Sequence, residues 1–480
     1  MNHERCKFQP SGFYASIETY HCNQEIFKNG ICIFHIPKKD HTAKDFNASD
    51  VEVDKEFANA LEKFIEKNKQ NDLDFSFFSF SSGSDLSYSF DQTVDFMGAF
   101  FCSKPKFQEA QFLRKVDFTD AKFLGDVDFG EAVFSEHVSF VSARFLGNVN
   151  FSFANFKNGA RFGSAIPLGA RNVVSYCFEK DVIFSGARFS GDIEFLGNDS
   201  QNWKVNFRGE AHEAQFWKDM LFGGRAIFHA IRISPGARVT FNSVDLSRAS
   251  FQLTDITSFE FKSVIWRKFG SRAGLIDEEA NGDFGPRGFP IEKVAENYRQ
   301  LVLNYEATRN YELAEDFHYG EMEIRRRAFI NNTGNKYLRY FRGFVTDFAI
   351  YKVSSRYGTS HARALLILAL LVLSFALAMM YAGFIPDSKI EHIQGSGFSM
   401  EKEINYDLFP GPSIVEVEFG QWLSDYSKAL LFAVATSTFQ KERYFEPSGN
   451  ASKFVVVFFV IVIAAQAAMF LFALRRHFKR

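Results

Sequence analysis

The sequence predicts a mainly β chain in which a long β-solenoid precedes a helical hairpin and two transmembrane helices. Three observations lead to this prediction. Of the 480 residues, 61 are Phe, and from Phe90 to Phe162 they recur in alternating steps of six and five residues. Ala and Val recur every 11 residues within the same stretch. Near the C-terminal end, runs of 22 and 21 residues lack charge, and about 20 apolar residues allow a helix to cross a bilayer.

Charge and cysteine content narrow the class of protein. The net charge of −2 argues against a chain that binds nucleic acid through a basic surface. Five cysteines, an odd and sparse number, argue against a disulfide framework and fit a reducing compartment. The first residues contain no apolar segment typical of a signal peptide, so none is expected.

The repeat unit reads A-x-F-x-x-x-V-x-F-x-x, so Ala or Val stands two positions before each Phe. Side chains two positions apart lie on one face of a strand. Polar or Gly-containing corners follow, as at 124–126 and 146–148. An 11-residue helical repeat is the alternative, but it would place Phe on two lines about 140° apart, and Gly, Val and Asp disfavour it. The unit therefore predicts short strands joined by corners into a coil.

Residues 244–253, with the sequence VDLSRASFQL, nearly match the A-(D/N)-L-x-x unit of the pentapeptide-repeat family. The chain resembles this family, in its Phe-centred form, over residues 73–270. The resemblance implies a right-handed quadrilateral β-solenoid, with each central Phe or Leu and the preceding Ala or Val pointing inward. Because alternate corners have one extra residue, we expect about 22 residues per coil. The repeat weakens at 163–171 and 198–214, where loops are expected to leave the coil.

Some members of this family imitate DNA with an acidic surface. From Phe90 to Phe162 this chain has nine Asp or Glu against eight Lys or Arg, whereas a DNA mimic needs a strongly negative charge. We therefore expect no nucleic-acid partner, and instead an unidentified protein partner for the solenoid.

Residues 1–45 hold three of the five cysteines, and the spacing C-x15-C-x9-C-x2-H connects them to a histidine. Zinc prefers four tetrahedral sulfur and nitrogen ligands, and C-x2-H is a common half-site. The segment resembles the small Cys/His module that precedes some pentapeptide-repeat proteins. We expect a structural Zn²⁺ held by Cys6, Cys22, Cys32 and His35. His3 and His21 are alternative ligands, and ordinary cysteines in a capping segment are the other interpretation.

Two segments flank the solenoid. Residues 46–72 place Phe57, Leu61 and Phe64 on one face of a helix, which predicts a helical capping segment before the first coil. Residues 271–289 are rich in Gly and in charge and are interpreted as a linker.

Residues 290–363 are expected to form a helical hairpin and a basic juxtamembrane region. Two apolar stripes at helical spacing predict the hairpin: Val294, Tyr298, Leu301, Val302 and Tyr305, then Leu313, Ala314, Phe317 and Ile324. The hairpin would cap the solenoid or oligomerise. Glu315, His318 and Glu321 have a spacing that can hold a metal, although a solvated face explains them better. Nine Lys or Arg against three Asp or Glu from Glu321 to Arg363 would contact anionic lipid or only set topology.

Residues 364–480 are expected to form a two-helix membrane domain with spans at 364–385 and 454–474. Basic residues flank the spans: Lys352, Arg356 and Arg363 before the first, and Arg475, Arg476, Lys479 and Arg480 after the second. The connecting segment has ten Asp or Glu against six Lys or Arg. The positive-inside rule then predicts a multi-pass protein of a bacterial inner membrane with both termini in the cytoplasm.

An apolar segment at 425–439 is too short to cross a bilayer, which indicates a re-entrant or interfacial helix. The order of span, short helix, Thr/Ser-rich turn and span resembles two-helix pore-loop ion channels over residues 364–480. Potassium selectivity is not supported, because the filter sequence TVGYG is absent. The candidate pore-lining residues are Thr436, Ser437, Thr438 and Gln466. Gln466 could instead join helices by a hydrogen bond.

These features predict an oligomeric, channel-like membrane effector that is gated or scaffolded by its cytoplasmic solenoid. An oligomer is required because two spans cannot enclose a pore. The alternative is a non-conducting, membrane-tethered scaffold for protein interactions. An enzyme is not expected, because no nucleophile–base set, phosphate loop or carboxylate pair is recognisable, and no catalytic residue or cofactor other than zinc is assigned.

Overall fold

The computed structural model describes residues 33–35, 48–102, 104–163, 176–199, 218–279, 291–331, 347–386, 404, 419–438 and 445–478. They belong to two compact units, Met1–Ile324 and Arg325–Arg480. The first unit contains the repeats and the elements that cover their two ends. The second contains the long apolar helices.

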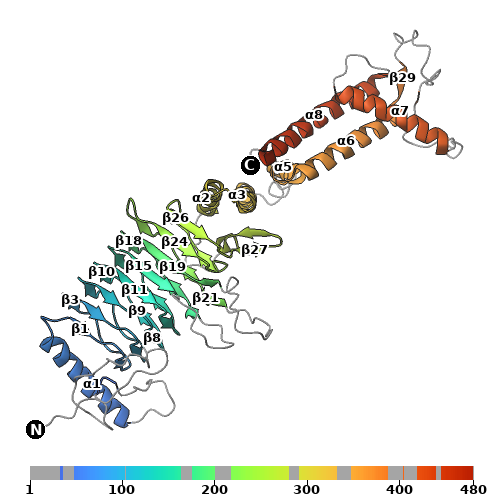
Figure 1. Cartoon of the computed structure of the whole chain (residues 1–480). Coiled ribbons are helices and arrows are strands. Elements are labelled where there is room, and N and C mark those ends of the chain that lie inside the picture. Colours follow the sequence, from blue (N-terminus) through green and yellow to red (C-terminus); the bar gives the residue numbers. More distant parts are fainter. Residues whose placement is uncertain are drawn as a thin grey trace, which may run out of the picture. The chain divides into compact units, whose positions relative to one another are not determined.

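The repeats form short strands that stack into four sheets within the described residues (Figure 1). The eight-stranded sheet contains β1 (Leu73–Asp74), β4 (Val94–Asp95), β7 (Val116–Asp117), β11 (Val138–Val141), β15 (Ala160–Gly163), β19 (Ile193–Leu196), β24 (Val239–Asn242) and β26 (Phe259–Lys262). The six-stranded sheet contains β3 (Ser89–Phe90), β6 (Gln111–Phe112), β10 (Val133–Phe134), β14 (Asn155–Phe156), β18 (Arg188–Phe189) and β23 (Arg232–Ile233).

The other two sheets complete each coil. The seven-stranded sheet contains β2 (Ser79–Phe80), β5 (Phe100–Phe101), β8 (Lys122–Phe123), β12 (Arg144–Phe145), β16 (Tyr176–Phe178), β21 (Lys218–Phe222) and β20 (Asn198–Asp199). The five-stranded sheet contains β9 (Val127–Asp128), β13 (Val149–Asn150), β17 (Val182–Ile183), β22 (Ala226–Ile227) and β25 (Ala249–Ser250). Of the named strands in the four sheets, only β20 and β21 pair antiparallel. Parallel stacking of this kind is that of a β-solenoid, as the sequence predicts.

The strand register gives the length of a coil. Val94 pairs with Val116 and Val116 with Val138, so one coil takes 22 residues, as expected from the repeat. Val149 pairs with Val182, 33 residues later, and Val182 with Ala226, 44 residues later. These longer intervals contain 163–171 and 198–214, where the sequence predicts loops. Residues 164–175 and 200–217 lie outside the described part of the chain.

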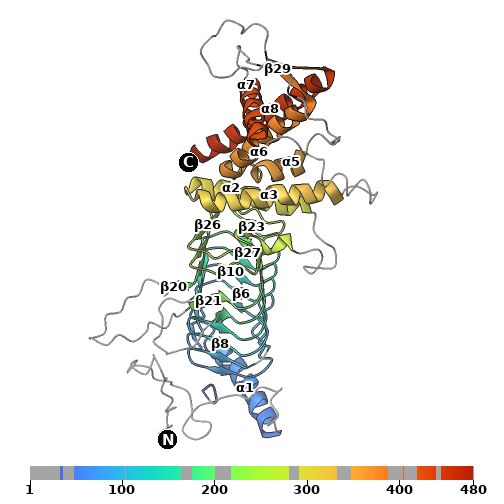
Figure 2. The same cartoon turned by 90° about the vertical axis from the view of Figure 1, so that its right-hand side faces the viewer.

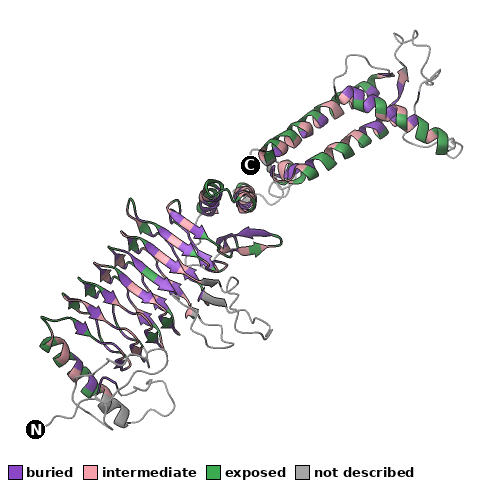
Figure 3. Ribbon diagram, viewed as in Figure 1, coloured by how far each residue is buried: buried purple, intermediate pink, exposed green. Residues whose placement is uncertain are grey.

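The Phe series fills the inside of the coils. Every Phe of the series from Phe90 to Phe162 is at most 1% exposed. Most rings stack on their equivalent in the next coil, as Phe118 does on Phe140 at 5.0 Å between centroids and 2° between planes, whereas Phe156 meets Phe189 edge-on. Figure 3 shows buried positions running from strand to strand across the sheets. Burial of each ring contributes roughly 1.5–3 kcal/mol, which explains why the chain uses so much Phe.

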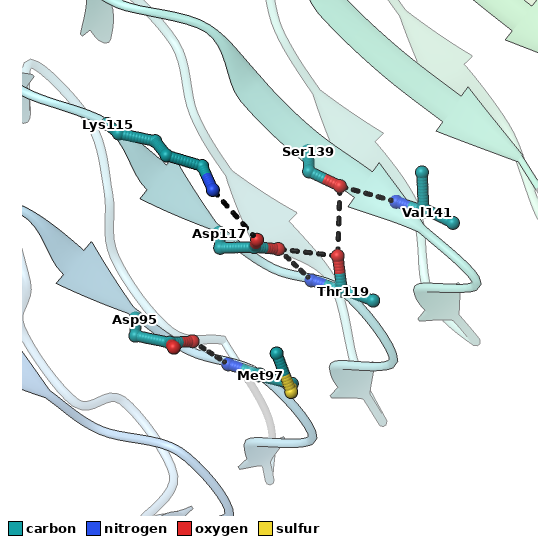
Figure 4. A network of polar contacts seen from close by, with 7 residues as sticks. All are labelled: Asp95, Met97, Lys115, Asp117, Thr119, Ser139 and Val141. Carbon is teal, nitrogen blue, oxygen red and sulfur yellow. Dashed lines mark hydrogen bonds and ion pairs between the residues drawn. The ribbon is translucent and has the colours of Figure 1, made fainter.

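The five-residue steps turn through a left-handed backbone position. The residue before each Ala of the series has a positive φ, for example 56° at Asp120 and 60° at Glu131. Such a residue costs about 1–2 kcal/mol unless it is Gly. Side chains help to fix these corners: the Asp117 carboxylate accepts a 2.9 Å hydrogen bond from the backbone N–H of Thr119 (Figure 4).

The N-terminal end of the solenoid is covered by α1 (Ala48–Lys67) and by residues 33–35. Phe57 and Leu61 of α1 are buried. The Phe34 ring stacks on that of Phe78 at 4.5 Å, and the Phe34 carbonyl accepts a 2.6 Å hydrogen bond from the Ser79 N–H. The first coil is therefore covered by both apolar and polar contacts.

The C-terminal end is covered by a β-hairpin, a short helix and two long helices (Figure 2). They are β27 (Arg267–Phe269), β28 (Arg272–Gly274), η3 (Ile276–Glu278), α2 (Ile291–Ala307) and α3 (Tyr311–Asn331). The interpretation of 271–289 as a linker is wrong for its first half. Asp277 and Glu278 are buried against the last coils, because Ser, Gln, Arg and Tyr side chains there complement their charge.

Side-chain amides of α2 close the exposed edge of the last coil. Asn297 Nδ2 donates to the carbonyl of Phe251 at 2.7 Å, and Asn304 Nδ2 to that of Phe259 at 2.6 Å. Gln300 Oε1 accepts from the N–H of Ile256 at 3.0 Å. The apolar stripe of α2 packs beneath these amides, and Tyr298, Leu301 and Tyr305 are buried as predicted. α2 thus binds backbone groups of the last coil that an open sheet edge would offer to another strand.

The second unit contains α5 (Asp347–Ser355), α6 (His361–Ala382), β29 (Phe384–Pro386), α7 (Phe419–Ser437), β30 (Phe445–Pro447) and α8 (Asn450–Phe478). α6 and α8 lie side by side in opposite directions, joined at one end by the antiparallel pair β29–β30 (Figure 1). Helical segments His361–Ala382 and Asn450–Arg476 are long and apolar enough to cross a membrane. They overlap the two predicted spans.

Candidate functional site

Gln466 lies inside α8 and is buried. Its Nε2 donates to the carbonyl of Ala364 in α6 at 2.9 Å and to that of Ser354 in α5 at 3.4 Å. These contacts are the ones expected if Gln466 joins helices, the alternative to a pore-lining role. The Gln466 side chain thus holds α8 against α6 and α5.

α7 contains the candidates Thr436 and Ser437, Thr438 follows directly after it, and the helix covers most of the predicted 425–439 segment. It begins at Phe419 and ends at Ser437. It packs on α6, where Phe432 contacts Phe375 with centroids 6.2 Å apart, and the Tyr426 hydroxyl donates to the Leu373 carbonyl at 3.2 Å. α7 is therefore held against α6 through its middle and last turns.

The three hydroxyls at the end of α7 differ in their surroundings. Thr436 is 1% exposed, and within the described residues its hydroxyl has no hydrogen-bond partner. The buried hydroxyl of Ser437 also lacks one there. Thr438 is exposed and donates to the carbonyl of Val434 at 2.9 Å, which completes the helix end. Thr436 and Ser437 thus hold polar atoms that a further polar group could satisfy.

α7 also carries an ion pair, between Asp425 and Lys428. Lys428 Nζ lies 3.2 Å from the Asp425 carboxylate one turn away, and Asp425 is buried. Pairing on the same helix lets two charged side chains lie among apolar neighbours at lower cost than either alone.

Of the proposed zinc ligands, Cys6, Cys22 and Cys32 lie outside the described residues, as do the alternatives His3 and His21. His35 is buried at the N-terminal end of the solenoid, with its ring 5.3 Å from that of Phe78. Among the described residues no group of three or more His, Cys, Asp or Glu side chains is arranged to hold a metal.

Of Glu315, His318 and Glu321 on α3, which have a spacing that can hold a metal, Glu321 makes an ion pair instead. Glu321 is buried and its Oε1 accepts from Arg299 Nε of α2 at 3.2 Å. This ion pair joins the two helices of the hairpin and supports a structural role for that face.

A buried polar cluster that the sequence did not indicate lies where η3 meets the last coils. Ser250 donates its hydroxyl hydrogen to Asp277 Oδ1, and His229 Nε2 lies 2.6 Å from the same Ser250 oxygen. Gln252 Nε2 and the Phe251 N–H donate to Asp277 at 2.8 and 3.1 Å. The carboxylate therefore accepts three hydrogen bonds in a buried site.

Burial changes the acidity of both ionisable members of this cluster. It raises the pKa of Asp277, against the hydrogen bonds from Ser250, Gln252 and the Phe251 N–H. It lowers the pKa of His229 to about 4, so the imidazole is neutral at pH 7. With the Ser250 hydrogen given to Asp277, His229 donates Nε2–H to the serine oxygen. This is not the order of a nucleophile and its base, in which serine donates to imidazole.

A second buried cluster fixes the β-hairpin to α2. Arg272 Nη2 donates to both carboxylate oxygens of Glu278, at 2.6 and 2.7 Å. The Tyr298 hydroxyl donates to Glu278 at 2.7 Å and accepts from the Leu275 N–H at 2.9 Å. Both partners of this ion pair are buried, so the contact orders the C-terminal end of the solenoid rather than binding a soluble ligand.

The outer surface of the solenoid carries polar ladders between coils. Asn148 Nδ2 donates to Asp126 at 3.1 Å, and Asn150 Nδ2 to Asp128 at 2.8 Å. Arg225 donates to Asp181 through two nitrogens, at 2.9 and 2.7 Å. Thr119 and Ser139 hydroxyls lie 2.9 Å apart (Figure 4). These polar contacts repeat from coil to coil along the solvated outer faces of the solenoid.

Comparison with known families agrees with the repeat geometry. Residues 118–166 match the family profile of pentapeptide repeats (9 copies). No curated protein matches the sequence. The matched stretch lies within the coils of 22-residue register described above. The chain thus contains a stretch that matches pentapeptide repeats, and two helices long and apolar enough to span a membrane.

Proposed function

We propose that this protein is a membrane-tethered scaffold that presents a capped pentapeptide-repeat solenoid to partner proteins. The observation that carries the proposal is the exposure of the two apolar helices. Only 28% and 11% of the residues in their most apolar stretches are buried. A core helix of a water-soluble protein would be mostly buried, so α6 and α8 need another apolar environment. A bilayer supplies it.

The charge distribution of the second unit supports one orientation. Gln466 contacts the start of α6, and Ser354 of α5 contacts Met469 of α8 at 2.8 Å. The basic flanks of both helices therefore belong to the same end of the helix pair. The positive-inside rule assigns that end, and with it the solenoid, to the cytoplasm. A bacterial inner membrane is the setting in which we propose this topology.

The solenoid is suited to binding because both of its ends are covered. Phe34 and α1 cover the first coil, and Asn297 and Asn304 of α2 cover the last. Strand-to-strand association at the ends is thereby blocked, which leaves the lateral faces for partners. We propose the right-handed quadrilateral form for these faces, supported by the four stacked sheets.

We also propose a structural Zn²⁺ in the N-terminal cap. The three thiols and one imidazole of Cys6, Cys22, Cys32 and His35 make up a tetrahedral donor set. His35 follows Phe34, the residue whose carbonyl accepts from Ser79 of the first coil. A metal held there would fix the cap, and its binding energy would contribute to folding.

A channel-like oligomer is the second candidate, and Thr436 favours it. An unsatisfied hydroxyl on a 1% exposed side chain at the end of a short helix between two spans is a costly feature. A conducting oligomer would satisfy it with water or a permeating ion. The scaffold is preferred because Gln466, the other buried polar candidate, already serves helix packing.

The tether is tested by alkaline extraction of membranes from cells that produce the full chain. Wild-type protein is expected to stay with the bilayer. Phe458→Lys combined with Ile461→Lys on the exposed face of α8 should release it or prevent insertion, because each charge costs about 2.5–3.5 kcal/mol near a helix centre. Leu113→Lys, at an exposed apolar position of the solenoid, is the matched control. Release of wild-type protein by alkali would contradict the proposal.

A further inference from the structure

The six-stranded sheet carries two arginines stacked directly on each other. Arg188 of β18 is in register with Arg232 of β23. Both side chains are exposed. Neighbouring strands lie about 4.8 Å apart, so the two positive charges leave the backbone close together, and like charges in register oppose each other.

This pair is unlike most arginines on the solenoid surface. Arg161 contacts Glu194 at 2.6 Å and Arg225 contacts Asp181 at 2.7 Å, each across neighbouring coils. Within the part of the chain that the structure describes, neither Arg188 nor Arg232 makes an ion pair. The fold therefore maintains two adjacent cations without a counterion of its own.

Hydroxyls and a third cation extend the same face. Asn155 is in register with Arg188 one coil earlier, and the exposed Lys157 follows directly after the end of β14. Ser234 donates to Ser190 at 3.0 Å, next to the two arginines. Lys157, Arg188 and Arg232, here called the basic ladder, thus follow three successive coils over about 10 Å.

An exposed aromatic side chain borders the basic ladder. Phe153 is 66% exposed and has a φ of 59°, which is unfavourable for an aromatic residue. Its ring covers Gly186, where an added Cβ would lie 2.5 Å from the ring. Gly186 stands in the corner before β18, two residues ahead of Arg188. An exposed Phe held in a strained conformation beside unpaired arginines is typical of a protein-binding surface, where aromatic residues and Arg are enriched.

We propose that Phe153, the basic ladder and the Ser190–Ser234 pair form the docking site for an acidic helix of a partner protein. Carboxylates at positions i and i+4 of a helix lie about 5–6 Å apart, close to the spacing of the coils. Two or three such carboxylates match the length of the basic ladder. The Ser190 and Ser234 hydroxyls offer further hydrogen bonds, and Phe153 offers a contact for apolar side chains of the partner helix. This inference rests on the proposed scaffold function and names the chemistry of its partner.

A long anionic polymer or a second copy fits this face less well. The ladder spans only three coils, and the stretch of solenoid that leads up to it, from Phe90 to Phe162, has almost balanced charge. The acidic ladder of this chain itself, Asp74, Asp95 and Asp117 in register, lies in the first three coils. Its centre, at Asp95, lies more than three coils before the centre of the basic ladder, at Arg188, so two parallel copies at the same height would not bring the two ladders together.

The test measures binding of a labelled alanine-based helical peptide of about 20 residues, with Glu at every fourth position, by fluorescence anisotropy. Full-length protein in nonionic detergent is used, and the same peptide with Gln in place of Glu is the ligand control. Wild-type protein should bind the Glu peptide and not the Gln peptide. Arg188→Gln combined with Arg232→Gln should weaken binding at least about tenfold without lowering stability, since it removes a repulsion. Phe153→Gly should weaken binding while stability is maintained or raised.

Lys122→Gln combined with Arg144→Gln is the matched protein control. These residues are another like-charge pair in register, on the seven-stranded sheet, but both act on the nearby Asp120 carboxyl. This variant should bind the Glu peptide as wild-type protein does. Equal loss in both double variants would overturn the proposal, as would no wild-type binding up to about 1 mM peptide. The proposal would also be overturned if Arg188→Gln combined with Arg232→Gln lost binding to phosphatidylserine vesicles but still bound the Glu peptide. Because the assay needs no bilayer, its failure leaves the tether untouched, and alkaline extraction tests the tether separately.

Discussion

The phenyl rings of Phe101 and Phe123, one coil apart, stack with their centroids 4.5 Å apart and their planes within 2°. Phe123 stacks on Phe145 of the following coil in the same way, at 4.5 Å and 8°. Each ring therefore packs two neighbouring coils at once. The column of rings, rather than any single coil, is the unit that stabilises the repeats.

Removing one ring from this column should be costly. We expect Phe123→Ala to destabilise the solenoid by about 3–5 kcal/mol, since the cavity would lie between two coils that cannot close independently. Chemical denaturation of the full chain in detergent measures this loss. Lys122→Ala, at the exposed neighbouring position of the same strand, should change stability by less than about 0.5 kcal/mol. Similar effects of the two substitutions would contradict the packing argument.

The amide contacts of α2 make a prediction about self-association. Asn297→Ala combined with Asn304→Ala leaves the Phe251 and Phe259 carbonyls without their donors. We expect a loss of about 1–3 kcal/mol for each contact and association of the exposed edges. Light scattering coupled to size exclusion detects the larger species. Glu296→Ala, a half-exposed position of the same helix, should leave both stability and size unchanged.

The low pKa of His229 predicts acid sensitivity. In the unfolded chain a histidine has a pKa of about 6.5, whereas burial lowers that of His229 to about 4. Between these values the unfolded state binds more protons, so the contribution of His229 is complete above about pH 6.5 and is lost as pH falls toward 4. His229→Gln retains a donor to Ser250 and should remove on the order of 2 kcal/mol of this pH dependence.

The check is denaturation of wild-type and His229→Gln protein between pH 7 and pH 4. The two stability curves should converge as the pH falls. Asp277 titrates in both proteins, so its raised pKa does not distinguish them. Parallel curves would show that His229 is not the group responsible.

The zinc proposal predicts that loss of one ligand in the N-terminal cap lowers both metal content and stability. Cys32→Ser should lower the zinc content per chain and the thermal stability of the solenoid, since three ligands bind the metal less well. Elemental analysis of purified protein gives the stoichiometry. Cys102→Ser, a buried cysteine outside the proposed ligand set, is the control and should retain zinc. Wild-type protein that purifies without zinc from zinc-replete cells would refute the site.

The parts of the fold set by local spacing could be predicted from sequence. Phe positions separated by five and six residues define the coil, because each corner is fixed by neighbouring residues. The stripe containing Tyr298 and Tyr305 defines the buried face of α2 in the same way. In both cases the residues that form the sequence pattern are the same residues that turn the corner or become buried.

Contacts between distant segments were not predictable in this way. Asp277 looked like a charged linker residue because its partners, Ser250 and Gln252, are 27 and 25 residues away in the sequence. The amides of α2 read as ordinary polar positions until the last coil is placed beneath them. Of the membrane candidates, Gln466 could be recognised as a buried polar residue, but only the packing of α8 on α6 shows which carbonyl it contacts.

The most direct test of the scaffold function is ion flux across liposomes that contain the purified full-length protein. The account predicts correctly inserted protein with flux no greater than that of protein-free liposomes, and no change in the Thr436→Trp/Thr438→Trp variant. Flux through wild-type protein that this variant abolishes would contradict the non-conducting scaffold and place the end of α7 at a pore.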